Sequence, residues 1–230
     1  MGANAQIAVP AFTAGQILTA AQQTQINTGI PVFATTTTRD AAFGGAGEKA
    51  LAEGQFAYIE ATNTTQYYDG AAWLGLGGKL GQVVSTTKTD TYTMSSQTYT
   101  TVTGLTATIT PSATTSKVLV IASLSAAGNP GVSRSTAQFI RASTPIAVAD
   151  TAGSRVVGTT PIPLMTGAEV SSQILLFLDS PSSTSALVYG VQVRCNDAAA
   201  TTYVNRSPTD TDNASFSRAV STITVMEILA

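Results

Sequence analysis

Two short runs, V-L-V-I-A at 118–122 and I-L-L-F-L at 174–178, are apolar at every position. Successive side chains of a β-strand point to opposite faces of its sheet, so a strand with one wet face should alternate apolar and polar residues. Both runs therefore need cover on both faces. In a sandwich of two sheets, the partner sheet covers only one face. Loops of the same chain or a second subunit must cover the other, and the association of extended apolar surface with interfaces favours the subunit.

The rest of the C-terminal region alternates. The segment 105–110 places Leu105, Ala107 and Ile109 on one face and threonines on the other, and 187–195 and 222–229 alternate in the same way. No segment after residue 80 has the pattern of a long amphipathic helix. Short strands separated by turn residues predict a mainly β chain in which residues 79–230 form a β-sandwich or jelly-roll-like domain.

An N-terminal arm, residues 1–31, contains one short helix candidate. Thr19 and Gln22 fit a capping box, in which the hydroxyl accepts from the third amide while the glutamine reaches back to the capping residue. A helix this short is marginal in water, so we expect it to pack on its own domain, a sister chain or a larger assembly. Its expected apolar anchors are Ile17, Leu18 and Ile26.

Residues 32–78 predict a small β-hairpin module. A strand over 56–60 alternates, with Ala57 and Ile59 on one face, and Thr38 is a candidate cap for a single helical turn. Asp69-Gly70 in Q-Y-Y-D-G-A-A-W predicts a tight hairpin turn with positive φ at both residues.

The aromatic residues beside that turn have two interpretations. Tyr67 or Tyr68 pairs with Trp73 across the hairpin, which would contribute roughly 0.2–1 kcal/mol, or the aromatics form an exposed platform for a flat sugar. A hairpin this small needs its aromatics as its own core, which favours the first reading. The glycine-dense segment 74–81 marks the boundary with the C-terminal domain.

The composition excludes several classes of protein. Charged residues are 10% of the chain, Ser and Thr about a quarter, and the net charge is −2. Without a Lys/Arg run we expect no nucleic-acid partner, and without a long apolar stretch no membrane insertion. The N-terminus lacks a basic segment, so we expect no signal peptide. One cysteine, Cys195, excludes an intrachain disulfide.

The sequence offers no catalytic, metal-binding or cofactor-binding set. Histidine is absent, which removes the commonest general base and transition-metal ligand. Most carboxylates fall in turns, and the conceivable pairs Asp150 with Glu169 and Asp210 with Asp212 are better explained as turn or cap residues. We expect no enzyme and no cofactor.

Glu227, Cys195 and the glycosylation sequons are explained without a functional site. We expect Glu227 to form an ion pair with one of three arginines, and Cys195 to be a small buried side chain. The three glycosylation sequons are expected by chance in so Thr-rich a chain. The arginines are Arg141, Arg194 and Arg218, and the sequons begin at Asn63, Asn205 and Asn213.

Two groups of motifs resemble proteins of tailed bacteriophages. A-G-Q-I-L-T-A-A-Q-Q-T-Q-I-N, P-V-F-A-T-T-T-T-R-D-A-A-F and G-Q-F-A-Y-I-E-A-T-N-T-T-Q-Y-Y-D-G-A-A-W look like the N-terminal modules of minor tail and fibre proteins. The second group looks like the C-terminal β domain of phage fibre or head-fibre proteins. It comprises L-G-Q-V-V-S-T-T-K-T-D-T, G-L-T-A-T-I-T-P-S-A-T-T-S-K-V-L-V, F-L-D-S-P, Y-V-N-R-S and S-T-I-T-V-M-E-I.

The resemblance implies a structural virion protein, assembled in the bacterial cytoplasm, that is a homotrimer attached to the tail or capsid through its N-terminal region. The chain departs from long fibres because it lacks coiled-coil heptads and a repeat shaft. A short fibre or spike with a projecting C-terminal domain is therefore the expected function. We expect Val120→Asp or Leu176→Asp to prevent assembly as well as folding.

The sequence also has alternative interpretations. One is a receptor-binding tip that recognises host cell-surface glycan through loops 127–135, 196–201 and 207–217. A capsid decoration or cement protein and a glycan depolymerase are less favoured, the last because it needs two facing carboxylates that nothing in the sequence pairs.

Overall fold

The computed structural model describes residues 9, 11–27, 29–46, 48–129, 134–165 and 167–229. The chain divides between Gly78 and Lys79 into two compact units, which are described separately. This division falls in the glycine-dense segment 74–81. Over the described residues, every helix is too short or too polar to cross a bilayer.

The N-terminal unit begins with a capped helix. Helix α1 (Ala20–Asn27) follows Thr19, whose backbone N–H donates to Gln22 Oε1 at 3.0 Å while the Gln22 N–H donates to Thr19 Oγ1 at 3.3 Å. The predicted capping box is confirmed. Ile17, an expected anchor, precedes the helix and is 92% exposed, so it does not anchor the helix on its own unit. Leu18 is half-buried, and the side chain of Ile26 lies outside the described residues.

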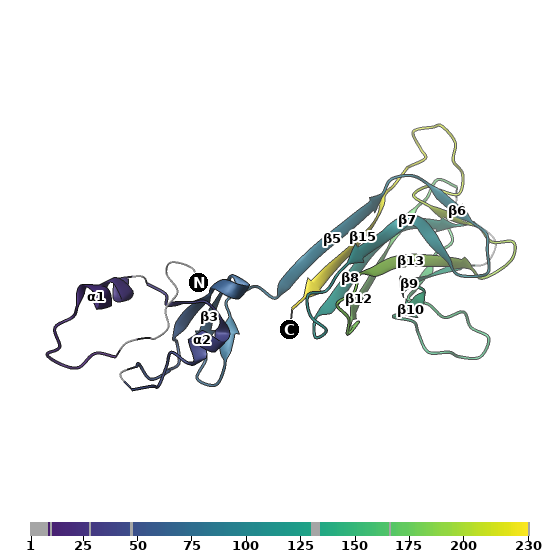
Figure 1. The fold of residues 1–230 in the computed structure, drawn as a ribbon. Helices are drawn as coiled ribbons and strands as arrows, with labels where there is room; N and C mark the ends of the chain where they lie inside the picture. The colour runs from purple at the N-terminus through teal and green to yellow at the C-terminus, as the bar shows by residue number, and fades with distance from the viewer. Residues whose placement is uncertain are drawn as a thin grey trace. The chain divides into compact units, whose positions relative to one another are not determined.

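A four-stranded sheet and two short helical turns form the rest of this unit (Figure 1). The strand order is β1-β2-β3-β4, with β1 parallel to β2 and the other pairs antiparallel. As predicted, Ala57 and Ile59 share the buried face of β2, where they form a small core with Phe33 and Ala42 from other segments. The elements are β1 (Val32–Phe33), α2 (Thr36–Asp40), β2 (Phe56–Ile59), η1 (Glu60–Thr62), β3 (Thr64–Tyr68) and β4 (Trp73–Gly75).

Helix α2 begins three residues earlier than the sequence predicted. Its cap is Thr35, whose hydroxyl accepts from the Thr38 N–H at 3.2 Å, so the prediction that Thr38 is the cap is wrong. All residues of the run 35–38 are threonines and can cap equally well. Capping at Thr35 places Arg39 in the last turn, where it is buried with its guanidinium carbon 4.6 Å from the centre of the Trp73 ring.

The predicted hairpin is present, but its turn is longer than expected. Tyr68 pairs directly with Trp73, so the loop contains residues 69–72 rather than Asp69 and Gly70 alone. Within this loop only Gly70 has positive φ, at 96°. Asp69 instead accepts hydrogen bonds from the backbone N–H groups of Ala71 at 2.9 Å and Ala72 at 2.7 Å. These bonds lower the pKa of the Asp69 carboxyl, with the Ala72 bond contributing most.

The C-terminal unit is a sandwich of two antiparallel sheets, which confirms the predicted fold class. One sheet has the order β5-β15-β8-β14-β6, with β12 on the other side of β8; the second has the order β10-β9-β13-β7, with β11 paired to β9 (Figure 1). We call these the β8 sheet and the β13 sheet. The first contains β5 (Leu80–Lys88), β6 (Tyr92–Met94), β8 (Lys117–Gly128), β12 (Ser171–Asp179), β14 (Thr202–Val204) and β15 (Ser221–Ile228). The second contains β7 (Thr100–Ile109), β9 (Ser135–Arg141), β10 (Thr144–Ile146), β11 (Thr160–Ile162) and β13 (Leu187–Cys195).

One hydrophobic core lies between these sheets. Alternation supplies much of it: every second residue of β15 and of the segment 118–124 in β8 is buried, and Leu105, Ala107 and Ile109 of β7 are buried as the sequence predicted. From the β8 sheet come Val118, Val120, Ala122, Leu175, Ile223 and Val225; from the β13 sheet come Leu105, Ala107, Ile109, Phe139, Tyr189 and Val191.

Candidate interaction surface

The outward face of the β8 sheet carries a continuous band of aliphatic side chains. The strand register places Leu178, Leu119, Met226 and Val83 in one line across β12, β8, β15 and β5. Leu176 and Ile121 form the next line, and Ile174 lies beyond them on β12. The Cβ atoms of directly opposed residues on one sheet face lie about 4.5–5.5 Å apart, so these side chains are close enough to touch their neighbours.

We call this band the apolar face. It consists of Leu80, Val83, Leu119, Ile121, Ile174, Leu176, Leu178, Met226 and Ile228. The three β12 residues are 45–65% exposed, Leu80 is 53% and Val83 is 50% exposed. Soluble monomers rarely leave contiguous apolar surface larger than a few hundred Å² uncovered. Serines and threonines fill the remaining corner of the same face, at positions 85, 87, 123, 222 and 224.

The outward face of the β13 sheet is different. There Thr106 and Thr108 of β7 oppose Gly190 and Val188 of β13, and Gln192 opposes Gln138 of β9. Gln138 Nε2 donates to Gln192 Oε1 at 2.8 Å. The two sheets thus differ sharply on their outer sides, although both contribute to the same core.

The two doubly apolar runs identified in the sequence lie side by side in β8 and β12. Their inward residues are buried in the core, and their outward residues form the centre and one edge of the apolar face. The described loops of the C-terminal unit leave this face exposed. The structure therefore contradicts the alternative in which loops of the same domain cover these strands.

The hairpin aromatics pack against each other. The ring centres of Tyr68 and Trp73 are 5.6 Å apart, and those of Phe43 and Trp73 are 5.9 Å apart. Arg39 lies over the Trp73 ring and donates hydrogen bonds to Asp40 and Gln66. These contacts make Trp73 part of the packing of the N-terminal unit, which supports the hairpin-core interpretation over the sugar platform.

The predicted ion pair of Glu227 is wrong. The Glu227 carboxylate is buried and accepts from both the backbone N–H and the hydroxyl of Ser112, each at 2.6 Å. Burial opposes the charged form, but the hydrogen bonds from Ser112 and its neighbours outweigh it and hold the pKa of Glu227 below its usual value. Glu227 therefore ties the last strand to the turn between β7 and β8.

The arginines named as Glu227 partners lie elsewhere. Arg141 pairs with Asp179 at 2.7 Å, and the Tyr189 hydroxyl donates to the same carboxylate oxygen at 2.7 Å. Burial, reinforced by this hydrogen bond, raises the pKa of Tyr189. Arg218 pairs with Asp210 at 2.8 Å, and Arg194 lies over the ring of Tyr99 at 5.8 Å from its centre.

The other residues singled out in the sequence are dispersed. Asp150 and Glu169 are exposed on separate segments, and Asp210 and Asp212 share a turn in which Asp210 pairs with Arg218. Among the described residues no group of three Asp, Glu, Cys or His side chains could hold a metal. Cys195 is buried as predicted, close to Ser135 Oγ at 3.8 Å.

The sequon asparagines have structural roles or lie in turns. Asn205 is fully buried, and its amide donates to the carbonyls of Lys88 and Asp90 at 2.8 and 2.9 Å. Asn63 has φ of 52° and accepts from the Tyr58 hydroxyl. Asn213 is exposed in a turn, where its side chain accepts from the Ser215 N–H at 2.9 Å.

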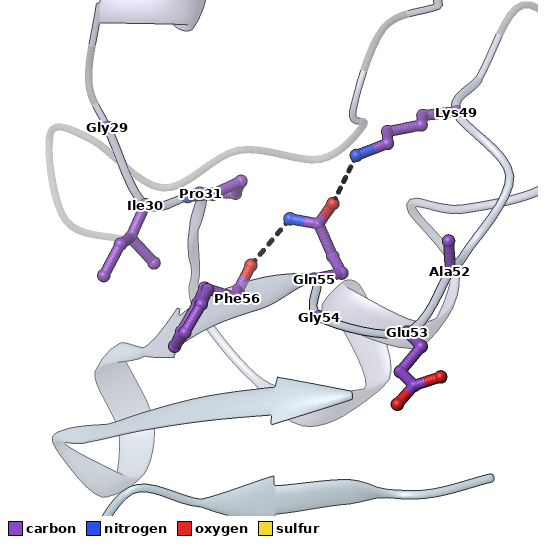
Figure 2. Close-up of a pocket in the computed structure, with 9 residues that line it drawn as sticks. All are labelled: Gly29, Ile30, Pro31, Lys49, Ala52, Glu53, Gly54, Gln55 and Phe56. Carbon is purple, nitrogen blue, oxygen red and sulfur yellow. Dashed lines mark hydrogen bonds between the residues drawn. The ribbon is translucent and has the colours of Figure 1, made fainter. Parts of the chain in front are cut away.

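The N-terminal unit contains a shallow pocket of about 270 Å³ (Figure 2). Lys49 Nζ donates to Gln55 Oε1 at 2.7 Å, and Gln55 Nε2 donates to the Phe56 carbonyl at 2.9 Å. Figure 2 shows the Glu53 carboxylate pointing away from these bonds. The polar groups of Lys49 and Gln55 thus satisfy each other, and this pocket supports no functional assignment.

Residues 130–133 of the predicted loop 127–135 lie outside the described residues, but the described ends of this loop contact loop 196–201. The Asn129 N–H donates to the Thr201 carbonyl at 2.9 Å, and the Asn196 N–H donates to the Arg134 carbonyl at 3.1 Å. Arg134 and Asn196 both line a pocket of about 370 Å³ beside β9. The third loop, 207–217, forms a separate pocket of about 270 Å³ around Asp210 and Arg218.

Segment 149–161 forms much of the larger pocket, and sequence reasoning did not single it out. It contains Gly153, Gly158 and Pro161 but no alternating pattern, so only its hydrogen bonds to β9 reveal its position. Burial raises the pKa of Tyr99, which contacts this segment, although the nearby charge of Arg194 works in the opposite direction.

Comparisons with known proteins add little. No protein-family model matches the chain, and no curated protein matches it. Among solved structures, the chain is similar to one from infectious bursal disease virus (Gt strain), at 11% identity and a TM-score of 0.37. The match covers 72% of this chain and 44% of the viral chain, so the chain spans less than half the length of that neighbour. At this identity and TM-score, the likeness assigns no function.

Proposed function

We propose that this chain is a non-enzymatic structural virion protein of a tailed bacteriophage, a short homotrimeric fibre or spike. Its N-terminal region attaches to the tail or capsid, and its C-terminal β domain projects from the particle. The virion, assembled in the bacterial cytoplasm, is its location. The motifs described above supply the phage assignment and the number of three subunits.

The apolar face is the single observation that carries the structural role. It crosses four strands of the β8 sheet, and its β12 residues are 45–65% exposed in the single chain. A chain with only 10% charged residues has few means of keeping such a surface soluble. A protein surface that covers it removes the apolar area from water, which favours association.

Exposed apolar residues near the N-terminus support attachment through that region. Ile17 is 92% and Phe12 is 40% exposed, and both precede helix α1. An amphipathic or apolar segment of this kind gains stability when it docks on another protein. The N-terminal arm is thus the part of the proposed fibre that contacts other virion proteins.

The mass of the full-length chain in solution tests this proposal. Light scattering should give three times the chain mass of 23.5 kDa, and this value should persist on dilution. A monomer at all concentrations would contradict the homotrimer and leave the apolar face without its proposed partner.

A second candidate function is recognition of host cell-surface glycan. One observation favours it: the described ends of loop 127–135 meet loop 196–201 beside β9, and the two loops contribute Arg134 and Asn196 to one pocket. Loops carried on a rigid β scaffold are a common location for binding residues. Binding of a defined saccharide by the purified chain tests this function independently of its mass.

A further inference from the structure

The arginines of this chain fall into two groups. Arg39, Arg141, Arg206 and Arg218 each lie within 4.0 Å of a carboxylate oxygen. The remaining ones, Arg134, Arg155 and Arg194, form no ion pair with any described carboxylate, and every Asp and Glu of the chain lies in the described ranges. Arg194 Nε donates to the Cys195 carbonyl at 3.4 Å and Arg155 Nη1 donates to the Ala152 carbonyl at 3.5 Å, which leaves further N–H donors of each guanidinium for an outside anion.

One of these remaining arginines lines a pocket, and the other two lie next to residues that line it. Arg134 lines the pocket of about 370 Å³ beside β9. Arg194 is the direct cross-strand neighbour of Thr136, which also lines it. Arg155 lies two residues before Val157, another lining residue, in an exposed turn.

The wall of this pocket is held firmly. The Thr159 N–H donates to the Ala137 carbonyl at 2.8 Å, and the Phe139 N–H donates to Thr159 Oγ1 at 3.1 Å. The Tyr99 hydroxyl donates to the Val157 carbonyl. At Gly158 a Cβ would lie 2.5 Å from Thr136 Cγ2, so glycine is needed for this close approach. A preformed pocket of a few hundred Å³ is typical of small-ligand sites.

The acidic residues nearby do not neutralise the arginines. Asp197 follows Asn196, and its carboxylate accepts from the Ala199 N–H at 2.8 Å, which commits it to a turn. Asp150 follows the lining residue Ala149 and is exposed, without an ion pair among the described residues. Because the whole chain has a net charge of −2, an anion is not attracted by the overall charge and must be bound by this local group.

We propose that this pocket binds the carboxylate of an acidic saccharide. Arg134 and Arg194 would hold the carboxylate, because a guanidinium presents paired N–H donors that match its two oxygens. The Asn196 side-chain oxygen already accepts from Thr136 Oγ1 at 3.1 Å, which leaves its NH₂ group to donate to sugar hydroxyls. The proposal extends the second candidate function by naming the ligand class and does not depend on the trimer.

Titration calorimetry on the full-length chain tests this assignment with trigalacturonate as the probe and maltotriose as its uncharged counterpart. We expect trigalacturonate to bind at least about 10-fold more tightly than maltotriose, and its affinity to fall as salt screens the charges. Arg134→Ala and Arg194→Ala should each weaken binding about 10-fold or more, since each removes a charge-assisted pair of hydrogen bonds. Arg194→Lys should fall between, because it keeps the charge but loses the paired donors.

Arg218→Ala is the matched control. It removes the same charge from an arginine that lines a different pocket and pairs with Asp210, so trigalacturonate affinity should not change. Thermal melts of all variants check that each is folded. Equal affinity for both sugars would show that the site does not select carboxylates, and unchanged binding by Arg134→Ala and Arg194→Ala would place any binding elsewhere. Binding of inorganic sulfate without trigalacturonate would show an anion site that takes no saccharide. Each of these results overturns the proposal but leaves the proposed structural role untouched.

Discussion

Replacing Leu176 with Asp separates folding from assembly. Leu176 lies on the outward side of β12 and is 61% exposed, whereas Val120 lies on the inward side of β8 and is fully buried. The sequence treats the two positions alike, and we expected either substitution to prevent both folding and assembly. Because only Val120 is buried in the single chain, we expect only Val120→Asp to prevent folding.

The effect of Leu176→Asp on the single chain is small. Complete burial of a leucine side chain contributes about 1.5–3 kcal/mol, and roughly two-fifths of Leu176 is buried, so the substitution loses about 1 kcal/mol from this source. The poorer strand propensity of Asp adds at most about 1 kcal/mol. Domains of this size have unfolding free energies of about 5–15 kcal/mol, so the monomer should remain folded. Val120→Asp places an unpaired charge in the core, at a cost of about 3–5 kcal/mol or more.

The effect on association is larger. A partner that covers the apolar face would bury the remaining three-fifths of Leu176, worth about 1–2 kcal/mol, and would also have to desolvate the new carboxylate. Together these terms exceed about 3 kcal/mol per contact, which corresponds to a dissociation constant raised more than about 100-fold.

The assay combines light scattering with a thermal melt followed by far-UV circular dichroism. We expect Leu176→Asp to be folded with a mass near 23.5 kDa, while the unchanged chain has three times that mass. Val188→Asp is the matched control, because Val188 is 40% exposed on the outer side of the β13 sheet, and it should not change the mass. A folded Leu176→Asp variant that remains trimeric would refute the assignment of the apolar face as the subunit interface.

Three smaller experiments examine other features. The pKa of Glu227 in the folded chain is below the ordinary 4.5, so its carboxylate contributes stability above pH 4.5 that is lost as pH falls through the folded pKa. Urea titrations of Glu227→Gln should show a lower free energy of unfolding at pH 7 and a smaller decline of that free energy below about pH 5. An unchanged pH profile would contradict the role assigned to the Ser112 bonds. Trp73 is the single tryptophan, so its fluorescence follows unfolding of the N-terminal unit. Tyr68→Ala removes a ring contact worth about 0.5–1.5 kcal/mol besides the buried area, so it should lower the unfolding midpoint seen by fluorescence but not the midpoint of the sandwich seen by circular dichroism. A shift in both midpoints would show that the two units unfold together. Cys195 is fully buried and should react with a thiol reagent only after denaturant is added; rapid reaction of the native chain would contradict its burial.

Local patterns predicted the elements that depend on neighbouring residues. The capping box of Thr19 and Gln22, the alternation in β2 and β7, and the pairing of a hairpin tyrosine with Trp73 follow from short-range rules and are present, although only the structure selects Tyr68 over Tyr67. The same rules gave wrong details where several residues could do the same task. Four consecutive threonines compete to cap α2, and the Asp69 side chain offers the hairpin a longer turn than Asp-Gly alone.

Partners distant in sequence were not predictable. Glu227 meets Ser112 rather than an arginine, and Arg141 meets Asp179, because strand register decides which side chains face each other. A one-residue shift in register would reverse every face. The pocket beside β9 also depends on strand register, since Arg194 becomes a neighbour of Thr136 only when β13 pairs with β9.

The sequence by itself determined that this chain is mainly β, that its C-terminal region forms a sandwich, and that two strands are apolar on both sides, because period-two alternation and its interruption are properties of consecutive residues. Only the tertiary structure decided that these strands are neighbours and that their outer residues merge with Val83 and Met226 into one exposed face. The physical reason is that a surface is assembled across strands. Hydrogen-bond register between segments far apart in the chain fixes it, and no local pattern encodes that register.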